Sequence, residues 1–141
     1  MPLTAFLRIP DVPGESGHPG HEGEIDIEGL SWGIARGATR GMTVLKRYDV
    51  ASPYLTLAAA QGRGFPEVVL TIRRDSGDAG SDFLTVTMER VVVATYDIED
   101  DDAPDGDGLR EKVSLSFDRV RVFYRDGRDE HEIGFEVMRH R

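Results

Sequence analysis

Four side chains that could bind a metal lie in one glycine-rich stretch near the start of the chain. His18 and His21 are followed by Glu22 and Glu24, and imidazole and carboxylate groups are common zinc ligands. The stretch Pro13–Gly23 lacks the pattern of a helix or a strand, so it does not provide the fixed geometry that a zinc site needs. We therefore predict no metal and no cofactor here.

A second group of carboxylates runs from Asp97 to Gly108, where seven acidic residues and no basic residue supply most of the net charge of −9. Carboxylates bind calcium, but the spacing does not fit an EF-hand loop. Taking Gly106 or Gly108 as the invariant glycine places Lys112 or Ser114 where a bidentate glutamate is required. We expect a solvated acidic loop. The remaining charge is close to balanced, which argues against a nucleic-acid partner.

No arrangement of residues indicates catalysis. The sequence lacks a GxSxG nucleophile motif, and Gly14–Gly17 is typical of a turn. The carboxylates fall in expected loops and on polar strand faces, where solvation explains them. Because the chain has no cysteine, disulfides and thiolate metal sites are excluded. We predict that the protein is not an enzyme.

Alternating apolar residues dominate the chain and predict a mostly β protein, with residues 1–141 in a single domain. In three expected strands the alternation changes parity, at Glu28–Gly29, Glu89–Arg90 and Asp118–Arg119. Such changes are typical of β-bulges, which allow long strands to bend into small barrels. We predict a small β-barrel of two antiparallel sheets. The expected strands are Leu3–Ile9, a strand opening at Ile25, Val68–Arg74, Phe83–Val93, Val113–Tyr124 and a last strand from Ile133 to Val137.

One short helix is expected beside the barrel. Ser52 has the character of an N-cap, Pro53 suits the first helical position, and Gly62 suits the stop after Tyr54–Gln61. So short a helix needs tertiary packing, which we expect through the side that carries Tyr54, Leu57 and Ala58.

The start of the chain carries an acidic residue and two prolines where a signal peptide has an apolar run. No segment approaches the ~20 apolar residues of a membrane span. We expect a protein made in the cytoplasm, without a signal peptide and without membrane insertion.

Several short motifs follow one another along the chain: FLRI at Phe6–Ile9, GES at Gly14–Ser16, His21, EIDI at Glu24–Ile27, SWG at Ser31–Gly33, and a helix opening at Ser52 before a VLTIRR strand. Taken in this order, they resemble the Hcp family, the tube subunits of the bacterial type VI secretion apparatus. The resemblance implies a small β-barrel with one helix, six copies in a ring, and rings stacked into a tube. It further implies a contractile sheath, a VgrG-like spike and effector proteins as partners, and secretion through the apparatus.

The family resemblance also implies roles for particular residues. The segment Arg36–Met42 is expected to project from the ring and contact its neighbour, through Arg36, Thr39, Arg40 and Met42. Its arginines suit an acidic partner surface. A family histidine near the position of His21 implies a hydrogen bond that orders the loop.

Small polar side chains lie opposite the apolar alternation of the strands, which in a monomer is the solvated side of a sheet. In a ring, part of this surface faces the lumen, where family members bind effectors, and Ser31 is the expected contact. Two alternatives stay open: a monomeric β-barrel binding module that uses the acidic loop, and a tail-tube protein of another contractile injection machine. The small polar set comprises Ser31, Thr71, Thr85, Thr87, Ser114 and Ser116.

Overall fold

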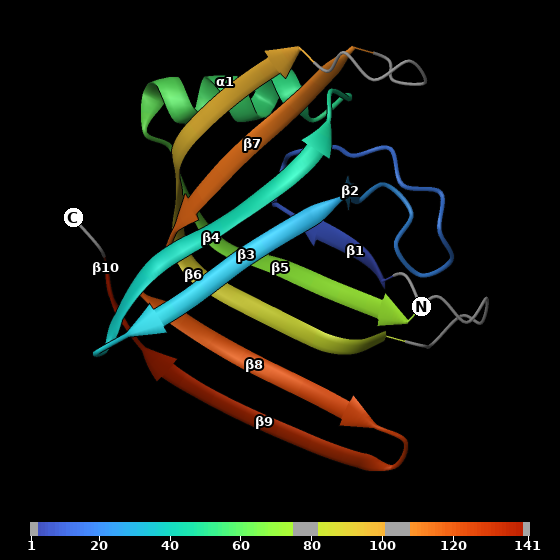
Figure 1. The fold of residues 1–141 in the computed structure, drawn as a ribbon, viewed down its shortest axis with the longest axis vertical. Coiled ribbons are helices and arrows are strands. Elements are labelled where there is room, and N and C mark those ends of the chain that lie inside the picture. Colours follow the sequence, from blue (N-terminus) through green and yellow to red (C-terminus); the bar gives the residue numbers. More distant parts are fainter. Residues whose placement is uncertain (1–2, 75–81, 101–107, 140–141) are drawn as a thin grey trace.

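The computed structural model describes residues 3–74, 82–100 and 108–139 (Figure 1). These residues form a mostly β structure with one short helix, as predicted. In the ranges described, no helix is long and apolar enough to cross a membrane. The elements are β1 Leu3–Arg8, β2 Ile25–Ile27, β3 Gly29–Ala35, β4 Ala38–Arg47, α1 Ser52–Gln61, β5 Gly64–Arg74, β6 Asp82–Asp100, β7 Leu109–Ser116, β8 Arg119–Asp126, β9 Asp129–Glu136 and β10 Met138–Arg139.

The strands close into a barrel. β5 pairs with β1 and β6, β7 pairs with β6 and β4, and β4 pairs with β3, all antiparallel. β2 pairs with β1 and leads directly into β3, and the Glu28 amide between them donates to the Leu45 carbonyl at 2.8 Å. The predicted barrel is confirmed. The parity change at Glu28–Gly29 is the passage between two strands, because β2 and β3 pair with different neighbours.

The long strand β6 bends at Arg90, whose φ is +56°. Met88 and Val91 are both buried, so the inward side changes parity at the bend as predicted. Before the bend β6 pairs with β8, and after it the same edge pairs with β7. The single strand expected over Val113–Tyr124 is therefore wrong: the chain forms two strands, because each pairs with a different half of β6.

The acidic segment is only in part as expected. Asp97 pairs with Lys112, and Glu99 pairs with Arg110, so β6 continues to Asp100. The expectation of a loop from Asp97 onward is wrong for these first residues, because β7 supplies a partner strand. Residues 101–107 lie outside the described residues.

Helix α1 packs against β6 at the end of the barrel. Leu55 and Ala58 are buried, whereas Tyr54 and Leu57 are 47% and 52% exposed, so the predicted packing side is correct only for Ala58. Gly62 ends the helix in the left-handed region, with its amide bound to the Ala58 carbonyl, as expected.

The N-cap is Ala51 instead of the expected Ser52. The Ser52 hydroxyl accepts a hydrogen bond from the Asp49 amide at 2.8 Å, and the Asp49 carboxylate accepts one from the Ala51 amide at 2.9 Å. The Ser52 hydroxyl is therefore bonded to the turn before the helix and does not cap the helix. This explains why the N-cap lies one residue earlier than expected.

A buried polar network joins this turn to the barrel. The ammonium group of Lys46 is inaccessible to solvent and binds Glu111, with further contacts to Asp49 Oδ1 at 2.8 Å and Ser52 Oγ at 3.2 Å. The Tyr96 hydroxyl donates to the other Glu111 oxygen. Strands β4, β6 and β7 and the start of α1 are thus connected through one carboxylate.

We predict that Glu111→Ala lowers the free energy of unfolding by about 3–5 kcal/mol, because it leaves the Lys46 ammonium buried without its main partner. The double variant Lys46→Met/Glu111→Leu should recover most of the loss, since it removes both charges. Urea unfolding followed by circular dichroism measures both changes. A loss below about 1 kcal/mol for Glu111→Ala would contradict the role given to this network.

Candidate functional surface

The outer face of strands β3, β4, β7 and β6 carries a row of hydroxyl groups. Ser31 lies opposite Thr43, Thr43 opposite Ser114, and Ser114 opposite Thr95. The Thr43 and Ser114 hydroxyls are 3.0 Å apart and hydrogen-bonded. These four residues, called here the hydroxyl row, form a neutral polar surface across four neighbouring strands.

Ser31 is exposed on this face. The next residue, Trp32, sets the direction in which the Ser31 side chain points. The Trp32 ring lies on the inner side, 6.3 Å from the ring of Phe117, and its indole N–H donates to Thr39 Oγ1 at 3.3 Å. Because side chains alternate along a strand, an inward Trp32 turns Ser31 outward.

The structure divides the small polar residues that the sequence singled out. One group lies on the face of the hydroxyl row, and the other lies on the paired strands β5 and β6 before the bend, where Thr71 opposes Thr85. The sequence pattern alone did not separate these faces, and it missed Thr43 and Thr95. The first group is Ser31, Ser114 and Ser116; the second is Thr71, Thr85 and Thr87.

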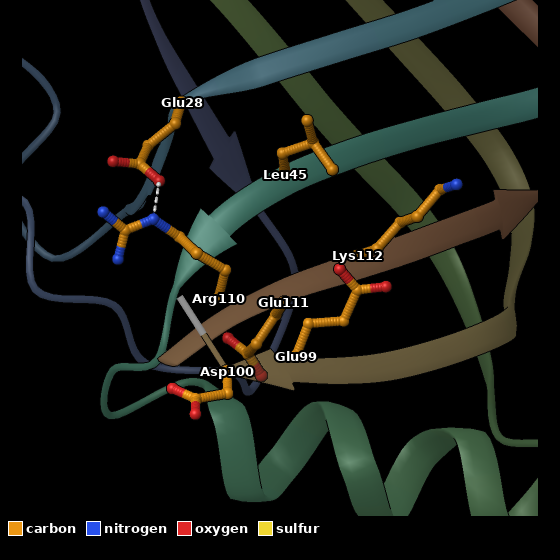
Figure 2. Close-up of a pocket in the computed structure, with 7 residues that line it drawn as sticks. All are labelled: Glu28, Leu45, Glu99, Asp100, Arg110, Glu111 and Lys112. Carbon is orange, nitrogen blue, oxygen red and sulfur yellow. Dashed lines mark ion pairs between the residues drawn. The ribbon is translucent and has the colours of Figure 1, made fainter. Parts of the chain in front are cut away.

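A recess of about 370 Å³ opens beside the hydroxyl row, where β6 ends and β7 begins (Figure 2). Glu28 accepts from Arg110 and from Arg47, each at 3.2 Å, and so forms one wall. Leu45 is 46% exposed and offers an apolar patch. The recess is lined by Glu28, Leu45, Glu99, Asp100, Arg110, Glu111 and Lys112.

The segment Arg36–Met42, expected as a projecting loop, is mostly strand. The turn consists of Arg36 and Gly37, with φ of +54° and +78°, and β4 begins at the next residue. Thr39 and Met42 are buried inside the protomer, so they have no surface to offer a neighbour. The loop expectation is wrong in extent. Arg36 and Arg40 are exposed and remain the contact candidates.

His21 orders the loop between β1 and β2, as the family resemblance implied. Its ring nitrogens lie 3.0 Å from Glu24 Oε1 and 2.8 Å from Asp82 Oδ2, and its ring stacks on Phe6 at 4.2 Å. His18 instead meets Phe6 edge-on. Within the described ranges no three histidine or acidic side chains are grouped so that they could hold a metal.

Asp82 connects this loop to the barrel. Its carboxylate accepts from Arg73 Nε at 2.8 Å, and Arg73 Nη2 donates to the Pro19 carbonyl at 2.7 Å. Burial alone raises the pKa of Asp82, but the hydrogen bonds from Arg73 and His21 outweigh burial and hold that pKa below its ordinary value.

The structure thus combines a mostly β barrel, one short helix and a row of hydroxyl groups across four strands. Residues 6–124 match the family model described as type VI secretion system effector, Hcp. The chain therefore belongs to the Hcp family, the secreted tube proteins of the type VI secretion system.

Individual relatives agree with this assignment. Protein hcp1 of Pseudomonas aeruginosa is 30% identical over 140 residues, which cover 88% of this chain and 84% of that protein. The crystal structure of Hcp1 from Salmonella typhimurium matches with a TM-score of 0.86 and 28% identity, over 96% of this chain and 95% of that one. A type VI secretion system effector from Yersinia pestis shares the fold, with a TM-score of 0.84 at 21% identity over 94% and 99% of the two chains.

We predict that Asp82 makes stability depend on acid pH. Because its folded pKa lies below the ordinary 3.8, its stabilisation is present above about pH 4 and is lost as the pH falls below that value. Asp82→Asn should be less stable than the parent at pH 6, and the difference should shrink toward pH 3. Thermal melts across this range test the expectation, with the exposed Asp26→Asn as control. A difference that stays constant with pH would contradict it.

Proposed function

We propose that this chain is the repeating subunit of a type VI secretion tube, in which six copies close into a ring, rings stack, and the lumen shelters effector proteins. Membership of the Hcp family supports the tube role. The observation that supports the lumen assignment is the hydroxyl row, four uncharged polar side chains that lie side by side on neighbouring strands. A contractile sheath and a VgrG-like spike are the further partners proposed for the tube.

Ring closure needs two different complementary surfaces on each subunit. Strand β9 offers one, since its sole partner among the described strands is β8. Its side chains are largely exposed, and Ile133 is 63% exposed. An exposed strand edge with an apolar side chain favours pairing with another chain. We propose that β9 faces the neighbouring subunit of the ring.

We predict a six-fold ring in solution. Light scattering over a range of concentration and salt measures the mass, and negative-stain electron microscopy shows the shape. Ile133→Glu should lower the ring fraction because it places a charge in the proposed interface, whereas Leu57→Glu, at a similarly exposed site on α1, should not. A strict monomer at high concentration would contradict the tube role and favour a monomeric binding module.

We predict that Ser31→Gln leaves ring mass unchanged and reduces the amount of effector that co-purifies with the ring, because the longer side chain covers part of the hydroxyl row. Thr85→Gln, on the other polar face, is the matched control and should retain effector. Ser31→Gln changes an exposed side chain and should alter stability by less than about 0.5 kcal/mol. Equal effector recovery from both variants would remove Ser31 from the cargo surface.

A further inference from the structure

We propose that a second, smaller recess beside the hydroxyl row binds a carboxylate group of the effector, and that Arg40 supplies the positive charge. The inference deepens the proposed function, on which it rests, because it names the chemical group that an effector presents to this face. Arg36 stays a contact candidate of the β3–β4 turn. The recess has a volume of about 110 Å³, and its lining includes Thr39, Arg40, Gly41, Ala94, Ser114 and Ser116.

A β-bulge in β4 turns the Arg40 side chain outward. The register between β3 and β4 shifts here, so that Arg40 and Gly41 together lie opposite the single residue Gly33. Such a bulge changes the direction of a side chain and is common beside active sites. Thr39 and Met42, on either side of the bulge, are buried, whereas Arg40 is exposed. The bulge therefore places a guanidinium group on the outer face of the sheet.

Buried contacts hold this bulge in place. Gly41 has a φ of +79°, and an added Cβ would lie 2.6 Å from the Leu115 carbonyl oxygen, so glycine is needed where β4 approaches β7. The Thr39 hydroxyl accepts hydrogen bonds from the Gly41 amide at 3.0 Å and from the Trp32 indole at 3.3 Å. The position of Arg40 thus depends on the interior of the barrel.

A second bulge leaves the hollow open. The register of β6 against β7 shifts between Val93 and Thr95, which leaves Ala94 as the extra residue of β6. Ala94 is exposed, and its methyl group does not fill the space beside β7. The two bulges lie on the strands either side of β7, and the recess lies between them.

The recess offers a cation and hydrogen-bond donors to a small anionic group. Arg40 forms no ion pair in the part of the chain that the structure describes, and no acidic residue is among those that line the recess. A guanidinium group can bind a carboxylate through two parallel hydrogen bonds, and the hydroxyls of Ser114 and Ser116 lie in the same lining. The volume suits one carboxylate group and is smaller than a site for a whole small-molecule ligand.

The recess shares the face of the hydroxyl row. Ser114 belongs to both. An added Cβ at Gly33 would lie 3.9 Å from Arg40 Nε, so the arginine side chain passes over β3 at that glycine. Ser31 lies two residues before Gly33 and therefore points to the same side of the strand. An effector bound at Ser31 can thus place a neighbouring acidic side chain on Arg40.

Saturation-transfer difference NMR tests the site, because it detects weak ligands of a large particle. One probe is the α-amide of N-acetylglutamic acid, which carries one carboxylate, and the other is its neutral glutamine counterpart. In the parental protein the glutamate probe should give a signal about fivefold larger than the glutamine probe, the factor expected for one exposed ion pair. The difference should shrink as the salt concentration rises.

Three variants separate the recess from general charge effects. Arg40→Gln should lower the glutamate signal about fivefold, to the level of the glutamine probe. Arg36→Gln removes the same charge from the nearby turn and is the matched control, which should keep the signal. Ala94→Leu should lower the signal without a change of charge, because the leucine side chain fills the recess. Melting curves by circular dichroism check that each variant is folded.

The outcomes distinguish this inference from the proposed function. Equal signals from both probes in the parental protein, or an equal loss in Arg36→Gln and Arg40→Gln, would overturn the carboxylate site. Displacement of the glutamate probe by less inorganic phosphate than acetate would assign the recess to phosphoryl groups and would overturn it as well. The measurement does not need a ring, so a monomeric parental protein that binds the glutamate probe would contradict the tube role alone.

Discussion

The bend of β6 at Arg90 is the constraint on which the rest of the barrel depends. A positive φ at a residue other than glycine costs about 1–2 kcal/mol, so the surrounding contacts must maintain it. Arg90 Nε lies 2.5 Å from Asp118 Oδ1, in the link between β7 and β8. The bend and the link are therefore tied together, and one edge of β6 serves two strands in succession. The position of β7, and with it the hydroxyl row, follows from this arrangement.

Two polar networks set the orientation of segments that apolar packing alone does not orient: helix α1 and the β1–β2 loop. Apolar burial has no preferred direction, whereas hydrogen bonds do. The Lys46–Glu111 network sets how α1 meets the barrel, and the contacts of His21 with Glu24 and Asp82 set the course of the β1–β2 loop. Both centres join residues more than 60 positions apart in sequence, which makes them long-range clamps rather than local turns.

Strand periodicity predicted the barrel and the parity change in β6, because alternation depends on local sequence. It could not distinguish a bulge from a bend or from two strands, since all three shift parity by one residue. Strand β4 was not predicted from the sequence. Its first residues include Arg40 and Gly41, which do not indicate a strand, and Lys46 is polar yet buried against the distant Glu111. Ser31 could be placed outward from alternation. The hydroxyl row needed the register of four strands, which only the tertiary structure supplies.

The hydroxyl row has a kinetic consequence. A hydroxyl that binds a guest gives up a water of similar strength, so each such contact contributes only about 1 kcal/mol, and no charge on the row itself adds to it. A guest held by several such contacts is retained while it touches many of them at once. The bound molecule dissociates quickly once a few of these hydrogen bonds are broken, because water then forms hydrogen bonds with the freed hydroxyl groups. For the effector contact that we propose at this row, the expected consequence is a short residence time of the bound effector.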